Sequence, residues 1–162
     1  MSPTLGFHIK SVKYAVDAVS CSLNLWDVGG QPSLRAFWRN YFEKTDGVLW
    51  VLDSADTARL REGVHELSAL LAQNAGVLTL APLLVLANKQ DVPGALSPAA
   101  LAQQLAPLGA HVHLHVQGCS ATHEAHTGVK DGVDWLARHM MNRLYALDTS
   151  RPRAQTQTEA ED

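Results

Sequence analysis

The sequence has little that would suit a secreted, membrane-spanning or nucleic-acid-binding protein. Its two cysteines, Cys21 and Cys119, are too few for a disulfide framework. No apolar run approaches the roughly 20 residues of a membrane span, and the N-terminus lacks the apolar core of a signal peptide. A formal net charge of -3 gives no electrostatic basis for binding nucleic acid or an anionic membrane. We therefore expect a cytoplasmic protein whose thiols are free.

Signals for direct lipid attachment are also missing. Glycine does not follow Met1, and the C-terminal residues form no prenylation motif, so we expect no lipid anchor in these residues. The sequence does contain 46% hydrophobic and 18% charged residues over 162 positions, which is typical of one globular domain.

Hydrophobic patterning predicts the strands. Residues 5–16 and 20–27 are rich in Val, Leu and Ile and predict a hairpin that turns near Asp17, although no Asn-Gly pair marks the turn. The short apolar runs at 47–53 and 83–87 predict buried parallel strands. Residues 111–117 alternate between polar and apolar, which predicts a half-exposed edge strand.

Helical spacing of apolar residues predicts three helices. One covers 56–74, and a short one begins at Ser97-Pro98, where serine supplies an N-cap and proline the first helical position. The last carries one apolar stripe, formed by Val129, Val133, Leu136, Met140 and Leu144. Alternation of strand and helix from residue 46 predicts an α/β domain with a mainly parallel sheet flanked by helices. We assign the domain to 1–147 and a disordered polar tail to 148–162.

The run Leu25-Trp26-Asp27-Val28-Gly29-Gly30-Gln31 carries the strongest local signal for chemistry. An apolar strand ends at an acid, and two glycines then allow another group to approach the backbone closely. A carboxylate beside exposed N–H groups suits Mg²⁺ and phosphate. An ordinary strand followed by a tight turn is the alternative.

Two further motifs follow predicted strands. Asn88-Lys89-Gln90-Asp91 comes directly after strand 83–87, and ligand sites of open α/β sheets lie at such carboxyl ends. Its amide and carboxylate are spaced to read a purine edge, with the carboxylate accepting from paired N–H donors. Cys119-Ser120-Ala121 follows the next strand, and its small residues leave backbone N–H groups free for a base carbonyl. Taken singly, each motif also fits a polar loop or turn.

Together and in this order, the motifs resemble those of the Arf-like (ADP-ribosylation-factor-like) small GTPases, with types two and three looking closest. The first switch of that family resembles residues 2–7, and its second switch resembles 26–31 and 38–42. Residues 53–56, 87–91 and 117–121 also match, and the resemblance covers 2 to about 147. It implies a G domain of the P-loop-NTPase type.

The resemblance implies GTP or GDP with Mg²⁺ as the cofactor and gives the site residues their roles. Thr4 would bind Mg²⁺ through its hydroxyl, and Asp27 would bind it through water. The N–H of Gly30 would sense the γ-phosphate, while Gln31 would orient the attacking water. Guanine recognition would fall to Asn88, Lys89, Asp91, Ser120 and Ala121, with Cys119 packing beside the base.

The implied function is a GTP/GDP-dependent switch that acts through effectors, in intracellular traffic of lipidated cargo or in ciliary and tubulin pathways. Its partners would be effectors and carrier proteins for lipidated cargo, an exchange factor and a GTPase activator. Phe7, Trp26 and Tyr41 resemble the aromatic trio that Arf-like proteins present to effectors, with core packing as the alternative. The competing hypothesis is a non-catalytic interaction module, a pseudo-GTPase, that binds partners through strand 5–14 and the same trio.

The N-terminal unit of the family has no counterpart in these residues. It consists of a first strand, a Gly-rich loop that ends in Lys and Ser/Thr, and a first helix. None of the five lysines follows a glycine. That loop supplies several charge-assisted hydrogen bonds of about 1.5–3 kcal/mol each, so we expect weak nucleotide binding. The simplest expectation is that the natural product begins upstream, and a short product without nucleotide binding is the alternative. The hairpin is also longer than the family's near residues 15–20.

Histidines at 111, 113 and 115 alternate and so share one strand face. With His123 and His126 they raise the possibility of a zinc site, but neighbours along one strand are nearly collinear and rarely complete a tetrahedron. We therefore predict a solvated strand face.

Overall fold

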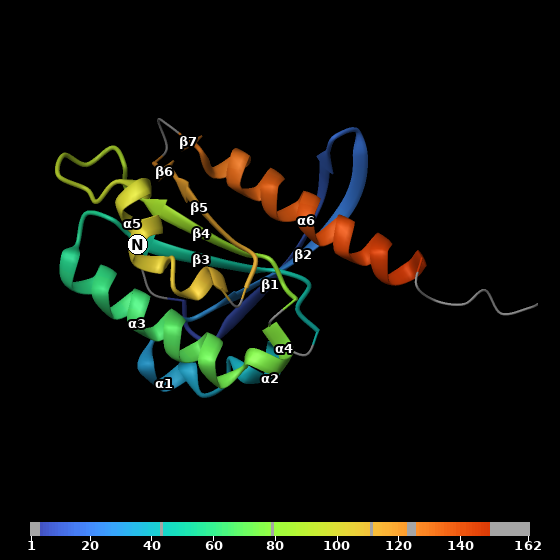
Figure 1. Cartoon of the computed structure of the whole chain (residues 1–162), viewed down its shortest axis with the longest axis horizontal. Helices are drawn as coiled ribbons and strands as arrows, with labels where there is room; N and C mark the ends of the chain where they lie inside the picture. The colour runs from blue at the N-terminus through green and yellow to red at the C-terminus, as the bar shows by residue number, and fades with distance from the viewer. Residues whose placement is uncertain (1–3, 43, 79, 111, 123–125, 150–162) are drawn as a thin grey trace, which may run out of the picture.

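The computed structural model describes residues 4–42, 44–78, 80–110, 112–122 and 126–149. The chain opens with two strands and two short helices: β1 (Phe7–Val16), β2 (Val19–Val28), α1 (Pro32–Arg35) and α2 (Arg39–Phe42). Strands and helices then alternate (Figure 1): β3 (Val48–Asp53), α3 (Thr57–Gln73), α4 (Ala75–Leu78), β4 (Leu83–Asn88), α5 (Pro98–Leu105), a 3-10 turn (Leu108–Ala110), β5 (Leu114–Gly118), β6 (Ser120–Ala121), β7 (His126–Thr127) and α6 (Val129–Thr149). No described helix is long and apolar enough to cross a membrane.

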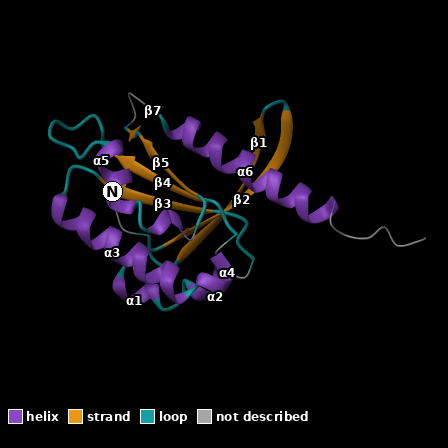
Figure 2. Cartoon of the chain, viewed as in Figure 1, coloured by secondary structure: helices purple, strands orange, loops and turns teal. Residues whose placement is uncertain are grey.

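A parallel sheet of order β3-β4-β5 forms the centre of the domain. Helices α3 and α5 pack on one of its faces, and α6 packs on the other (Figure 2). This arrangement confirms the predicted parallel sheet flanked by helices. The hairpin β1–β2 is a separate antiparallel sheet, and within the described residues no strand joins it to the parallel sheet.

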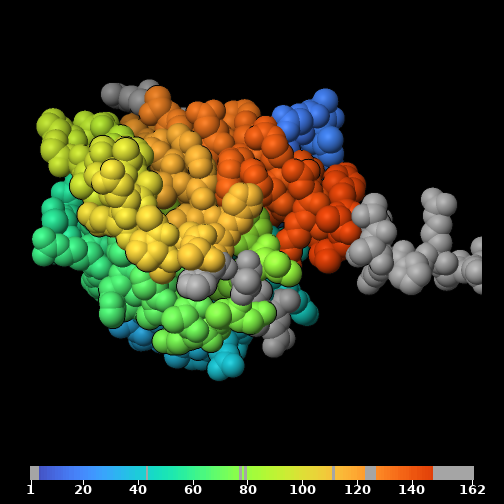
Figure 3. Space-filling view, in the orientation of Figure 1, coloured from blue at the N-terminus to red at the C-terminus, as the bar shows by residue number. Residues whose placement is uncertain are grey.

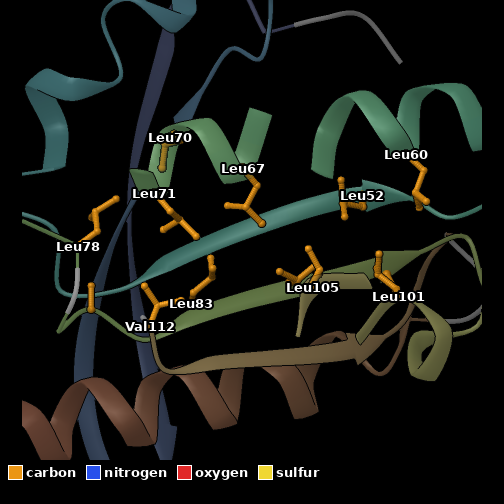
Figure 4. Packing of buried hydrophobic residues seen from close by; sticks show 13 residues of the cluster. Leu52, Leu60, Leu67, Leu70, Leu71, Leu78, Leu83, Leu101, Leu105 and Val112 are labelled. Atoms are coloured by element: carbon orange, nitrogen blue, oxygen red, sulfur yellow. The ribbon is translucent and has the colours of Figure 1, made fainter. Parts of the chain in front are cut away.

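The main core lies between the parallel sheet and the two helices on its first face (Figure 4). Leu67 of α3, Leu83 of β4 and Leu101 of α5 are at most 1% exposed. Burying a leucine side chain contributes about 1.5–3 kcal/mol, so these contacts fix α3 and α5 firmly on the sheet. Ser97 caps α5 as predicted, its side chain accepting from the N–H of Ala100, and Pro98 begins the helix.

The second face of the sheet is covered only in part, which corrects the prediction that 47–53 is a fully buried strand. Leu49 and Val51 of β3 are 40% and 56% exposed. Their register partners on β4, Leu84 and Leu86, are 0% and 6% exposed on the same face. Because α6 packs mainly against β4 and β5, it covers this face of β3 only in part.

The hairpin turns where predicted, through Asp17 and Ala18, which both have positive φ of 50° and 63°. Such a two-residue turn matches the right-handed twist of the strands that it joins. The tip packs against α6 (Figure 3): Arg138 donates to both carboxylate oxygens of Asp17, and the Tyr14 hydroxyl donates to Asp134 at 2.5 Å. Strand β1 begins at Phe7, later than the predicted residue 5, because Gly6 before it has a φ of 87°.

The histidine-rich strand β5 is a half-exposed edge strand as predicted, but its start and its surroundings differ from the prediction. Strand β5 begins at Leu114 rather than at residue 111, and α6 lies across it. His115 stacks on Trp135 of α6, and His113 meets Trp135 and His139 edge-on, so these two histidines do not form a purely solvated face. Burial lowers the pKa of His113, and the nearby His139 and His115 add to this effect. His111 and His123 lie outside the described residues.

Helix α6 ends at Thr149, and of the predicted apolar stripe Val129, Leu136 and Met140 pack on the sheet while Leu144 is 47% exposed. The predicted tail therefore starts two residues too early, because 148 and 149 still belong to the helix. The rest of that tail lies outside the described residues.

Candidate functional site

The first cluster of the site forms where β2 ends. Strand register places Phe7 opposite Val28, so the residues that precede β1 lie next to those that follow β2. The Thr4 hydroxyl donates to the Asp27 carboxylate at 3.2 Å, and the Gly29 N–H donates to the Gly6 carbonyl at 2.9 Å. The two predicted metal ligands are thus neighbours. A hydroxyl and a carboxylate are the hard oxygen donors that Mg²⁺ prefers.

The two glycines differ in what surrounds them. A Cβ on Gly29 would lie 2.5 Å from the Thr4 carbonyl oxygen and 2.5 Å from a methyl of Leu34, so only glycine fits there. A Cβ on Gly30 would meet nothing within 4 Å, and Gly30 is exposed. At Gly29, the groups that approach the backbone closely therefore belong to the protein itself. Gly30 instead borders open space.

Gln31 follows as the residue that precedes α1. Its backbone is extended, its side chain makes no capping hydrogen bond, and Pro32 occupies the first turn. The Gln31 amide is thus not committed to closing α1.

Two side chains without a predicted role in the site hold the glycine pair. The Trp38 indole Nε1 donates to the Gly29 carbonyl at 3.1 Å, and Arg35 Nε donates to the Gly30 carbonyl at 3.2 Å. Arg35 also pairs with Glu62 at 2.8 Å and with Glu66, both on α3. The ion pairs of Arg35 join α1 to α3, and no spacing in the sequence indicates any of these contacts.

The second cluster forms where β4 and β5 end side by side, with Ala87 opposite Gly118. The Asn88 side-chain oxygen accepts from the N–H of Ala121 at 3.1 Å. The Ser120 hydroxyl donates to the Asp91 carboxylate at 2.6 Å. The two predicted base-reading motifs, separated by about 30 positions of chain, therefore come together through these two bonds.

Lys89 turns the chain within this cluster. It has a φ of 68°, a left-handed backbone that non-glycine residues adopt at a cost and often at functional sites. Its ammonium lies 2.7 Å from a carboxylate oxygen of Asp53, and the bond from Lys89 holds the pKa of Asp53 below its usual value. The role of Asp53 was not predicted, although its position is a usable signal because Asp53 is the register partner of Asn88 at the ends of β3 and β4.

Cys119 packs behind the base-reading side chains. It is 2% exposed, its N–H donates to the Ala87 carbonyl, and its Sγ lies 3.7 Å from the Asn88 side-chain oxygen. Burial raises the pKa of its thiol, which keeps the sulfur protonated and unreactive.

The aromatic trio Phe7, Trp26 and Tyr41 forms one cluster, with ring centroids 5.3–5.9 Å apart. Phe7 and Trp26 are each 49% exposed, so the alternative of core packing does not hold for them. Offset and tilted rings at this spacing attract each other, and the trio therefore presents a defined apolar surface.

Both clusters fit a guanine nucleotide with Mg²⁺. Thr4 and Asp27 supply oxygen donors for the metal, and Gly30 offers an accessible N–H. Asn88 and Asp91, braced by Ala121 and Ser120, supply the amide and carboxylate that a purine edge needs. Within these 162 residues no glycine is followed by lysine.

Comparisons with known proteins agree on one family. Residues 1–140 match the ADP-ribosylation factor family. ADP-ribosylation factor-like protein 2 of Arabidopsis thaliana is 45% identical over 91% of this chain and 77% of its own length, and that of Drosophila melanogaster is 47% identical with the same coverage. The solved structure of the small GTPase Arl6 from Trypanosoma brucei, with the nucleotide analogue GppNp bound, is 26% identical and superposes with a TM-score of 0.75 over 88% of this chain and 83% of that one.

Proposed function

Since this chain belongs to the ADP-ribosylation factor family as an Arf-like small GTPase, we propose that it is a guanine-nucleotide switch that uses the two clusters described above. The observation that carries the proposal is the pair of bonds Ala121 to Asn88 and Ser120 to Asp91. They fix an amide and a carboxylate at the carboxyl ends of parallel strands, where ligands of such sheets bind.

Each residue then has a task that its surroundings support. Asp91 accepts from the paired N–H donors of guanine, while Asn88 and Ala121 hold the loop that faces the base carbonyl. Thr4 and Asp27 hold Mg²⁺, which neutralises phosphate charge when it is bound. Gln31, whose side chain is not used as a helix cap, orients the water for hydrolysis.

Partners follow from the surface beside the first cluster. The trio Phe7, Trp26 and Tyr41 offers effectors an apolar patch, and β1 offers its backbone for pairing with a partner strand. Because Thr4 and Gly29 tie the start of β1 to the metal site, nucleotide exchange reaches that surface directly. We propose carriers of lipidated cargo as the effectors, in traffic or in ciliary and tubulin pathways, with an exchange factor and a GTPase activator setting the state in the cytoplasm.

The second candidate function is a nucleotide-independent interaction module. The observation that favours it is the same trio, which is exposed and preorganised in a chain without a Gly-Lys phosphate loop.

Titration of the purified chain with fluorescent GDP, in the presence of Mg²⁺ and with fluorescent ADP as the control, separates the two. The switch requires guanine-selective binding, and we expect it to be weak, in the high-micromolar range or above. Equal binding of both nucleotides, or none at all with retained capture of a partner, would favour the module.

A further inference from the structure

The peptide that joins Gly29 to Gly30 is held from one side. Trp38 Nε1 donates to the Gly29 carbonyl at 3.1 Å. A trans peptide is planar, so its carbonyl and the following N–H point in opposite directions, and the described residues contain no cis peptide. Fixing the Gly29 carbonyl therefore also fixes the direction of the Gly30 N–H.

The next peptide is held as well. Arg35 Nε donates to the Gly30 carbonyl at 3.2 Å, and its guanidinium is fixed in turn by Glu62 and Glu66. Glycine has the widest backbone freedom of any residue. With both flanking peptide planes anchored, Gly30 loses most of that freedom.

Both anchors stand on rigid parts of the domain. The Trp38 ring meets Trp50 of β3 edge-on at 5.5 Å between centroids, and it packs against the main core. The two glutamates belong to α3, whose Leu67 and Leu70 are buried. The orientation of the Gly30 N–H is thus tied to the parallel sheet and to α3.

The opposite side of this peptide is open. Gly30 is exposed, and in the described part of the chain its N–H has no protein acceptor; space is also free where a Cβ would stand. Thr4, paired with Asp27, lies next to it, since a Cβ on Gly29 would meet the Thr4 carbonyl oxygen at 2.5 Å.

We propose that Trp38 and Arg35 are positioning residues that aim the Gly30 N–H at the terminal phosphate of GTP and so set the preference for GTP over GDP. This inference rests on the proposed function. Neither residue touches the nucleotide, because both act on carbonyls that face the protein.

The test compares Trp38→Phe with Trp50→Phe. Both keep an aromatic ring in the same pair, but the first removes the donor to Gly29, whereas the buried Trp50 Nε1 has no hydrogen-bond partner among the described residues. NMR titration with Mg²⁺ and either GDP or a non-hydrolysable GTP analogue, carried to millimolar nucleotide, gives both affinities. We expect Trp38→Phe to lower the analogue-to-GDP affinity ratio by about tenfold, as for one lost hydrogen bond to a charged group. Trp50→Phe should leave the ratio unchanged.

An unchanged ratio in Trp38→Phe, or an equal fall in Trp50→Phe, would overturn the inference. A wild-type chain that binds neither nucleotide would remove the proposed function instead. The positioning role is then judged without nucleotide, from the residual dipolar coupling of the Gly30 N–H. A fixed orientation in wild type and Trp50→Phe with averaging in Trp38→Phe supports it, and identical values in all three proteins refute it.

Discussion

At the scale of single residues, the proposed function assigns the choice of base to Asp91. Its carboxylate offers acceptors only, one of which binds Ser120, and guanine presents two N–H donors to it. In Asp91→Asn one acceptor becomes a donor that opposes those of guanine, whereas xanthine presents a carbonyl at the same place. We expect guanine nucleotide affinity to fall at least tenfold, given about 1.5–3 kcal/mol for a hydrogen bond to a charged group.

Competition between guanine and xanthine nucleotides measures the change in base preference. Asp131→Asn on α6 is the control, because it removes the same charge elsewhere. If Asp91→Asn lowers the affinity for both bases equally, the side chain supports the loop and does not read the base.

Tyr14 gives a second residue-level prediction. Burial and its bond to Asp134 raise the pKa of Tyr14 to about 12. Because the pKa is higher in the folded than in the unfolded chain, where it is near 10, the protonated hydroxyl stabilises the fold below about pH 10. This contribution is lost as the pH rises from 10 toward 12.

Absorbance of tyrosinate against pH should show one late titration that Tyr14→Phe removes, and unfolding experiments at pH 8 and 11 should show a smaller pH effect in that variant. A Tyr14 that titrates near pH 10 would mean that the bond to Asp134 does not form in solution.

Much of the candidate site could be predicted at this scale because its residues are adjacent in sequence and follow strands. The order of Asp27, Asn88 and Ser120 was enough to expect one site. Asp53, Trp38 and Arg35 could not be assigned, because each acts through a contact across 9 or more positions or through a backbone carbonyl that no motif encodes.

At the scale of elements, the sequence of the hairpin turn disfavours the backbone conformation that the turn adopts. Ala18 has a φ of 63°, a region that costs a residue with a Cβ about 1–2 kcal/mol, whereas glycine enters it freely. We expect Ala18→Gly to raise the free energy of unfolding by about 0.5–1 kcal/mol, measured in urea. Ala15→Gly, within β1, should lower it by about 0.5–1 kcal/mol. Destabilisation by both would show that the turn has another conformation in solution.

The same turn shows why element boundaries were only partly predictable. Local signals sufficed for α5, because Ser97 and Pro98 form its cap within three residues. The hairpin tip lacks the usual glycine or asparagine, and contacts of Asp17 and Tyr14 with α6 hold it instead. Those contacts join residues more than 100 positions apart, so no local pattern reports them.

At the scale of the whole molecule, the apolar run of β3 predicted two covered faces and the fold covers one. An apolar run shows that both faces of a strand can be buried, but it does not show which helices cover them. Helix α6 packs on β4 and β5, and Leu49 and Val51 remain 40% and 56% exposed. The hairpin and the parallel sheet are likewise separate sheets that the local patterns could not distinguish from one.

This uneven cover predicts opposite outcomes for two register partners. Val51→Lys places an ammonium at a position that is 56% exposed, so the free energy of unfolding should change by no more than about 1 kcal/mol, and binding of a hydrophobic dye should fall. Leu86→Lys, at the facing position that is 6% exposed, buries an unpaired charge under α6 and should cost at least about 3 kcal/mol. Urea unfolding and dye fluorescence measure both. Equal destabilisation would mean that β3 is covered in solution, and the open face described here would then have to be abandoned.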